Sequence, residues 1–172
     1  MMLTVGVAIA IPEPLGSQLR QKRAAFGDPM AETVPSHITL MPPMEANAAS
    51  LDDVCGTLQS VAPGLRPFPM TLRGTGTFRP VSPVVFIAVS QGISDTEILA
   101  QRLRASLGFP APDFPFHPHV TIAHNLDDAV LDRAFDELGD FECSFQVDAF
   151  HLYVHEDEDG WTPRREFLLG PG

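Results

Sequence analysis

The sequence predicts an α+β fold built from two similar halves, each running β-α-β-α-β, with one more strand at the end. Strand-like and helix-like segments alternate along the 172 residues, and their order begins again after about 80 positions. A short motif, His-aliphatic-Thr-aliphatic, occurs once in each half, as HITL and as HVTI. We therefore expect one domain over 1–172, with a first repeat over about 1–80 and a second over about 81–172.

The first half contains five elements that follow from hydrophobic periodicity and from their end signals. They are a strand over 3–12, a helix over 13–27 that stops at Gly27, a strand over 37–41 closed by Pro42 and Pro43, a helix over 50–62 capped by Ser50, and an extended segment over 68–78 with glycine bends.

The second half repeats this order and adds a strand. Its elements are a strand over 83–90, a helix over 94–108 that ends at Gly108, a strand over 119–123, a helix over 125–139, and long strands over 141–156 and 161–170 around a polar turn. Two such halves predict pseudo-twofold symmetry, mainly antiparallel sheets flanked by helices, equivalent strands side by side, and a central groove.

The repeated motif places its histidine and threonine side chains on one face of each strand. Residues i and i+2 of a strand point to the same side, so His37 and Thr39 project together, while Ile38 and Leu40 turn into the core. His119 and Thr121 repeat this arrangement 82 positions later. A pseudo-twofold axis between the halves brings both pairs to one cleft.

Two imidazoles and two hydroxyls suit phosphoryl transfer without a metal. One imidazole removes the proton of the attacking oxygen, and the other protonates the leaving oxygen, since histidine titrates near neutral pH. Threonine hydroxyls donate to the non-bridging phosphate oxygens and align the group. The assignment of acid and base to His37 and His119 stays open.

The composition limits the partners. Against 11 basic residues stand 22 acidic ones, a net charge of −11, which repels the backbone of long nucleic acids and anionic membranes. The two cysteines make no disulfide framework, and the apolar start of the chain has no basic segment of a signal peptide. We expect a cytoplasmic monomer without metal or cofactor, and a short phosphorylated ligand is compatible with this charge.

The motifs HITL and HVTI, about 80 residues apart in a bilobal repeat, resemble the 2H phosphoesterase superfamily, in particular its 2′-5′ RNA ligase-like and cyclic phosphodiesterase branch. The resemblance covers essentially the whole chain. It implies a metal-independent enzyme of RNA processing that acts on 2′,3′-cyclic or 2′-5′-linked nucleotide phosphates. It also implies that His37 and His119 are the acid/base pair and that Thr39 and Thr121 hold the phosphate.

This sequence departs from that family at one position. Many relatives place an arginine that helps bind phosphate two residues after the second motif, and here that residue is His124. A protonated histidine supplies the same charge only below its pKa. The substrate therefore stays open between cyclic RNA ends, an ADP-ribose cyclic phosphate and 2′-5′ oligonucleotides.

Further candidates have two interpretations each. Phe116, with Phe114 in the same loop, either stacks on a base or anchors the loop. Tyr153 and Trp161 flank the last turn, and each either lines the cleft or is a half-buried ring. The basic cluster RQKR at 20–23 is either a solvated helix face or a phosphate contact.

Two other functions are weighed against this one. A metal enzyme would use His117 and His119 with a further ligand, but would leave the first motif unexplained. A non-catalytic nucleotide- or RNA-binding module would keep both motifs without turnover.

Overall fold

The computed structural model describes residues 1–113, 115–157 and 159–171, so Phe114 lies outside the described residues. Five elements form the first half of the chain: β1 (Met2–Ala10), α1 (Leu15–Ala25), β2 (His37–Asn47), α2 (Leu51–Val61) and β3 (Phe68–Thr77). Seven follow: β4 (Val84–Gln91), α3 (Ile93–Ser106), β5 (His119–His124), α4 (Asp128–Glu137), β6 (Glu142–Val147), β7 (Ala149–Glu156) and β8 (Gly160–Leu168). Short 3-10 turns cover Pro29–Glu32, Ala48–Ser50 and Ala62–Gly64.

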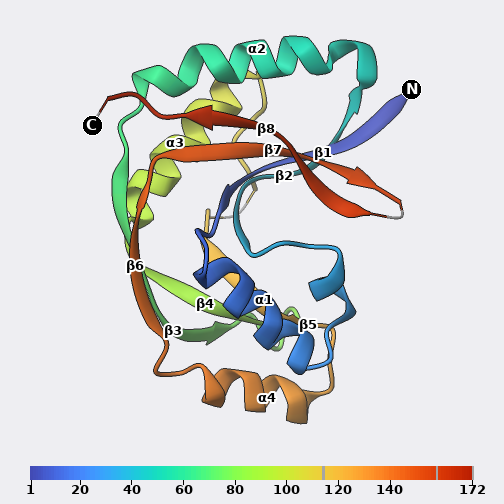
Figure 1. Cartoon of the computed structure of the whole chain (residues 1–172), viewed down its shortest axis with the longest axis vertical. Helices are drawn as coiled ribbons and strands as arrows, with labels where there is room; N and C mark the ends of the chain where they lie inside the picture. Colours follow the sequence, from blue (N-terminus) through green and yellow to red (C-terminus); the bar gives the residue numbers. More distant parts are fainter. Residues whose placement is uncertain (114, 158, 172) are drawn as a thin grey trace.

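The strands form two antiparallel sheets of four, which confirms the predicted α+β fold (Figure 1). The order is β2-β1-β7-β8 in one sheet and β5-β4-β3-β6 in the other. The two orders match when β1 is set against β4, β2 against β5, β7 against β3 and β8 against β6. The predicted pseudo-twofold relation is therefore visible in the topology.

Each sheet, however, takes strands from both halves of the chain. The third strand of the first half, β3, leaves the sheet of β1 and pairs with β4, while β7 returns to pair with β1. The prediction that equivalent strands lie side by side is not met by β1 and β4, which belong to different sheets. The equivalent edge strands β2 and β5 do contact each other between the sheets.

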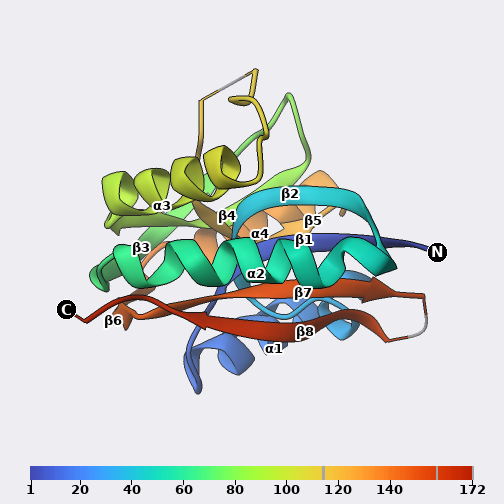
Figure 2. The same ribbon diagram turned by 90° about the horizontal axis from the view of Figure 1, so that it is seen from above.

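The helices cross between the sheets in the same symmetric way. Helix α1 follows β1 but packs against β5, and α3 follows β4 but packs against β2. Seen from above, α1 and α3 lie on opposite sides of the molecule (Figure 2). Helix α2 lies along the sheet of β8, and α4 covers β3, β4 and β5.

The aliphatic residues of both motifs are in the core, as predicted. Ile38, Leu40, Val120 and Ile122 are each at most 1% exposed. Burial of such side chains stabilises the fold by about 1.5–3 kcal/mol each relative to exposure. The core therefore holds the histidine-bearing face of each strand in one orientation.

Two predicted elements differ from the structure beyond shifts of at most three residues at the element ends. Strand β2 continues through Pro42 and Pro43, because it is an edge strand with a register shift at this point and needs no N–H there. The segment 141–156 is two strands rather than one, separated at Asp148, where the chain passes from one sheet to the other. The apolar side chains change from odd positions (Cys143, Phe145, Val147) to even positions (Phe150, Leu152, Val154) across the break, so a shift in the alternation marks the change of sheet.

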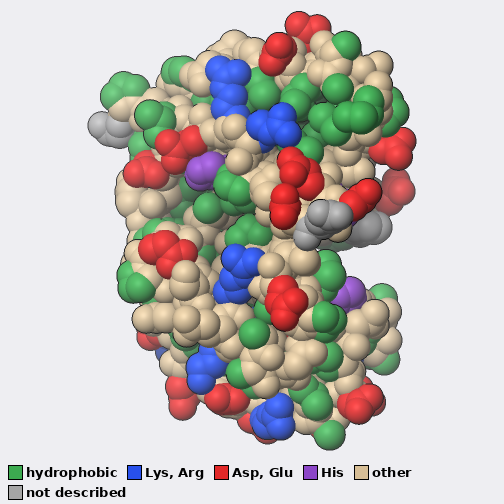
Figure 3. Space-filling model, turned by 45° about the vertical axis from the view of Figure 1, so that its right-hand side comes forward, with side chains coloured by type: hydrophobic (Ala, Val, Ile, Leu, Met, Phe, Trp, Pro, Cys, Tyr) green, Lys and Arg blue, Asp and Glu red, His purple; other side chains and the backbone are tan. Residues whose placement is uncertain are grey.

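Among the described residues, no helix has the length and apolar character needed to cross a membrane. The surface is hollowed at middle height between the upper and lower sheets, and acidic side chains are spread over both parts (Figure 3).

Candidate active site

The two motif histidines have the same local geometry. Nδ1–H of His37 donates to the carbonyl oxygen of Pro35 at 2.8 Å, and Nδ1–H of His119 donates to that of His117 at 2.7 Å. Because a carbonyl only accepts, these contacts place the proton on Nδ1 and leave Nε2 with its lone pair. Neither Nε2 has a hydrogen-bond partner among the described residues. Each imidazole therefore presents a free nitrogen that accepts or donates a proton.

Each motif strand also has a β-bulge directly after its threonine. Thr39 pairs with Ala8 and Met41 with Val7, so Leu40 is the extra residue; Ile122 is the extra residue of β5 by the same count. The bulge residue and the residue after it are consequently both buried, Leu40 with Met41 and Ile122 with Ala123.

The bulge decides where His124 points. Without it, Thr121 and His124 would face opposite sides of β5. With it, His124 is opposite Val84 and Thr121 is opposite Phe86, two positions of β4 that share a face. His124 thus lies on the same face as His119 and Thr121, at the far end of the strand, with its side chain half-buried.

A small pocket of about 100 Å³ lies beside His37. Its wall includes Gly6, Tyr153 and Trp161. Gly6 is opposite Tyr153 in the sheet, and the indole of Trp161 lies over the glycine, so the missing side chain leaves the space. Tyr153 is therefore at the cleft, 6% exposed, and burial raises the pKa of its phenol to about 12.

A large groove of about 1050 Å³ lies beside His119. Its walls come from β2 at Thr39–Met44, from the C-terminal end of α3, and from the proline-rich segment that precedes β5, including Phe116. Thr39, Met41 and Pro43 line both spaces, so the small pocket and the large groove adjoin at Thr39. Phe116 is half-buried and also packs against the core, so it has features of both its interpretations.

His119 is packed among aromatic rings. Its ring centroid is 5.0 Å from that of Phe78, 5.2 Å from Phe86 and 5.5 Å from His117. Phe86 occupies the space above Gly76, where an added Cβ would come within 2.6 Å of the ring. Aromatic side chains therefore fill the space beside His119 on the sheet of β5, whereas the corresponding space beside His37 on the sheet of β2 is an open pocket.

Burial lowers the pKa of both histidines below the ordinary value of 6.5. For His37 the carbonyl of Pro35 opposes this change, and the positive charge of Arg23 adds to it. For His119 the carbonyl of His117 opposes it, and the like charges of His117 and His37 add to it. The charge of His37 thus acts on His119, and burial disfavours the protonated form of both imidazoles in the free protein.

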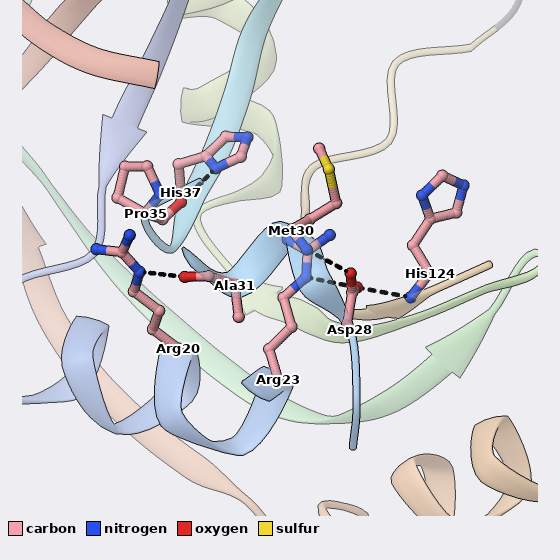
Figure 4. A network of polar contacts seen from close by, with 8 residues as sticks. All are labelled: Arg20, Arg23, Asp28, Met30, Ala31, Pro35, His37 and His124. Atoms are coloured by element: carbon pink, nitrogen blue, oxygen red, sulfur yellow. Dashed lines mark hydrogen bonds and ion pairs between the residues drawn. The ribbon is translucent and has the colours of Figure 1, made fainter. Parts of the chain in front are cut away.

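A buried ion pair fixes the segment between α1 and β2, which precedes His37. Arg23 Nε donates to Asp28 Oδ2 at 2.7 Å, and both side chains are buried. The same carboxylate accepts the backbone N–H groups of Met30 and His124, while the imidazole of His124 points away from it (Figure 4). Arg20 donates to the carbonyl oxygens of Ala31 and Glu32. The solvated-face interpretation of RQKR is therefore wrong for Arg23, which links α1 to β5.

The predicted site residues lie on two edge strands that contact each other, His37 and Thr39 on β2 and His119, Thr121 and His124 on β5. His37, Thr39 and His119 line the two adjoining spaces, whereas Thr121 and His124 are not among the described lining residues. Thr121 is half-buried beside Phe86, and its hydroxyl, like that of Thr39, has no hydrogen-bond partner among the described residues.

Sequence reasoning missed other residues that shape the site. These are Asp28, Phe78, Phe86 and Arg104. The glycines opposite or under large rings, Gly6 and Gly76, were the only local signal for the pocket and for the aromatic cluster.

A family comparison decides the affiliation of the chain. Residues 11–159 match the model of the family described as the 2′-5′ RNA ligase superfamily. The chain belongs to this superfamily. The resemblance of the two His-x-Thr motifs to 2H phosphoesterases is thereby confirmed.

Relatives within the superfamily carry general names. A Bacillus cereus (strain B4264) protein, provisionally named a phosphoesterase, is 32% identical over 149 residues, which cover 84% of this chain and 85% of the relative. A Bacillus thuringiensis (strain Al Hakam) protein with the same name is 30% identical over the same coverage.

Solved structures show the same fold at lower identity. LigT of Escherichia coli, crystallised with 3′-AMP, has a TM-score of 0.73 and 22% identity, covering 99% of this chain and 100% of LigT. A Thermus thermophilus structure has a TM-score of 0.69 and 24% identity, covering 98% of this chain and 100% of that protein. The architecture of two four-stranded sheets is thus a LigT-like fold.

Proposed function

We propose that the protein is a metal-independent phosphodiesterase that acts on cyclic phosphodiesters, of the 2′,3′- or ADP-ribose type, or on 2′-5′ phosphodiesters of small nucleotides or RNA ends. The observation that carries the proposal is the duplicated imidazole geometry. His37 and His119 both hold Nδ1–H on a carbonyl and leave Nε2 free beside adjoining spaces. Superfamily membership and the names of the relatives support phosphoester chemistry.

In the hydrolytic step, Nε2 of one neutral imidazole removes a proton from a water molecule as the water oxygen bonds to phosphorus. The bond from phosphorus to the leaving sugar oxygen breaks, and the second imidazole, protonated, gives its proton to that oxygen. The hydroxyls of Thr39 and Thr121 donate to the non-bridging oxygens and keep attacking and leaving oxygens in line. The product is a phosphomonoester, and the proton removed from water balances the one given up.

The lowered pKa values affect the two roles differently. A low pKa keeps the base neutral, which favours proton removal, but it also depletes the protonated acid in the free protein. A bound phosphodiester anion raises the pKa of both imidazoles, because a nearby negative charge favours their protonated form. Substrate binding therefore helps charge the acid.

The test is turnover of nucleoside 2′,3′-cyclic phosphates and of a 2′-5′ dinucleotide after EDTA treatment, with wild type and His119→Ala compared. We expect turnover that survives the chelator and is lost in the variant. Loss with EDTA and recovery with zinc or manganese would favour a metal enzyme. Binding without turnover of any substrate would favour a nucleotide-binding module.

A further inference from the structure

The ends of α1 and α3 repeat each other in sequence. Residues 23–28 read RAAFGD, and residues 104–109 read RASLGF. Both helices end in a glycine with positive φ, 91° at Gly27 and 76° at Gly108. The residue after each glycine donates its N–H to the carbonyl oxygen of the arginine, from Asp28 to Arg23 and from Phe109 to Arg104. Arg23 and Arg104 are therefore equivalent residues of the two halves.

In the first half the charge of the arginine is neutralised inside the protein. Arg23 is 7% exposed and its partner Asp28 is 2% exposed. The carboxylate of Asp28 also accepts the backbone N–H of His124 at 3.1 Å, so the pair ties α1 to the edge of β5. The role of this arginine is therefore structural.

In the second half the partners of that contact are missing. Phe109, 43% exposed, stands where Asp28 stands in the first half. The position of β2 equivalent to His124 is Pro42, which has no N–H to donate. Arg104 makes no ion pair with any residue that the structure describes.

Arg104 instead lines the large groove, together with Thr39 and His119. Among the described lining residues it is the single Lys or Arg, and the exposed Asp113 is the single carboxylate. The remaining walls are mostly apolar, and apolar walls strengthen the attraction between a cation and an anion. In a protein of net charge −11, this guanidinium is the position in the groove with the strongest electrostatic attraction for an anion.

We propose that Arg104 is a specificity-determining residue that binds a second phosphate group of the substrate, away from the phosphodiester held between His37 and His119. The second phosphate comes from a terminal phosphate or from a neighbouring nucleotide. A guanidinium binds a phosphate with two parallel hydrogen bonds. A groove of about 1050 Å³ is at the upper end of ligand-site volumes, which suits a substrate longer than one mononucleotide. This inference rests on the proposed phosphodiesterase function.

The test measures binding, so its result can be interpreted even if the protein turns over none of the substrates. The affinities of adenosine 3′,5′-bisphosphate and adenosine 3′-phosphate are compared by calorimetry at low salt, for wild type, Arg104→Gln and Arg102→Gln. Arg102 is exposed on the same helix and serves as a charge-matched control. We expect wild type and Arg102→Gln to prefer the bisphosphate by about tenfold or more, and Arg104→Gln to lose this preference.

A second variant, Phe109→Asp, introduces the carboxylate that the first half has at Asp28. Since Phe109 is partly exposed, the change is compatible with folding, and the new charge should pair with Arg104 and abolish the preference as well. Wild type with no preference for the bisphosphate would overturn the proposal. So would an Arg104→Gln variant with the wild-type ratio of affinities and only a lower stability, because Arg104 would then act only on the end of α3.

The same substrates separate the two proposals in turnover. A 5′-phosphorylated adenosine 2′,3′-cyclic phosphate and its unphosphorylated form are compared by kcat/KM. Turnover of both with no dependence on Arg104 would overturn the role of Arg104 and leave the phosphodiesterase proposal standing. Absence of turnover together with Arg104-dependent binding would overturn the phosphodiesterase proposal and leave the role of Arg104 in phosphate binding standing.

Discussion

The two halves of the molecule share the geometry of their histidines but not the surroundings. His37 and His119 have the same backbone partner two residues earlier, and β2 and β5 have the same bulge after the threonine. Around them the first sheet opens a small pocket under Trp161, whereas the second is filled by Phe78 and Phe86.

This difference indicates which features the duplication preserved. The proposed proton transfer at both ends of a phosphodiester needs two similar imidazoles, and His37 and His119 are similar in their hydrogen bonds and strand geometry. A substrate with different groups on its two sides needs unlike walls. The asymmetric residues, from Gly6 and Trp161 to Arg104 and Phe109, provide these walls.

The largest expected effect tests whether the two histidines are equivalent in the reaction. His37→Ala and His119→Ala should each lower kcat by about 10²- to 10⁴-fold, because each removes a general acid or base. The measurement is kcat on the substrate found by the turnover assay, with His151→Ala as the control, whose imidazole faces Glu166 at 3.3 Å. A large loss in one variant beside normal turnover in the other would contradict an acid/base pair.

The second prediction compares the two helix ends. Asp28→Ala leaves Arg23 buried without its partner and should lower the free energy of unfolding by about 3–5 kcal/mol. Phe109→Ala at the equivalent place should cost less than about 1 kcal/mol, because that side chain is partly exposed. Urea unfolding of both variants gives the two values. Equal losses would show that the ion pair has no special structural task. The double variant Arg23→Met, Asp28→Ala should recover only the part of the loss that comes from the unpaired charge, because the N–H groups of Met30 and His124 still lack their acceptor.

The third prediction compares the two hydroxyls. Thr39→Val and Thr121→Val keep the shape of the side chain and remove one donor, so each should lower kcat about a hundredfold. Thr71→Val on β3, where the hydroxyl contacts Gln91 and Ser144, is the control. An effect on KM alone would mean that the hydroxyl binds the ground state and the transition state equally.

The smallest effect is a shift of the pH profile. The base must be neutral and the acid protonated, and burial lowers both pKa values below 6.5. As pH rises past the lowered pKa of the acid, the proton it must give is lost, so kcat/KM should be highest below pH 6.5. The profile of kcat should lie at higher pH, because the bound anion raises both pKa values.

His117→Phe sharpens this prediction, since it removes one of the like charges that lower the pKa of His119. The limb of the kcat/KM profile that moves to higher pH then belongs to His119. If neither limb moves, the charge of His117 does not reach the reacting imidazole.

The sequence alone determined the features that depend on local periodicity, namely the direction of side chains in the strands and the repeat of the two halves. The alternation of side chains in a strand placed His37 with Thr39 and His119 with Thr121, and turned Ile38 and Val120 inward. The offset of about 80 residues between the motifs predicted two related halves. These inferences succeed because a strand's side-chain direction is set by its own backbone.

Only the tertiary structure decided which strands pair and which charges meet. The apolar positions of 141–156 change from odd to even at Asp148, but nothing in the pattern shows that the second part joins the other sheet, because both sheets accept the same alternation. The cluster RQKR looked like one polar surface, yet Arg23 is buried because Asp28, held by the 3-10 turn that follows it, lies against β5. Pairing across long stretches of chain depends on how the halves pack, and the same local arginine is neutralised in one half and faces the groove in the other.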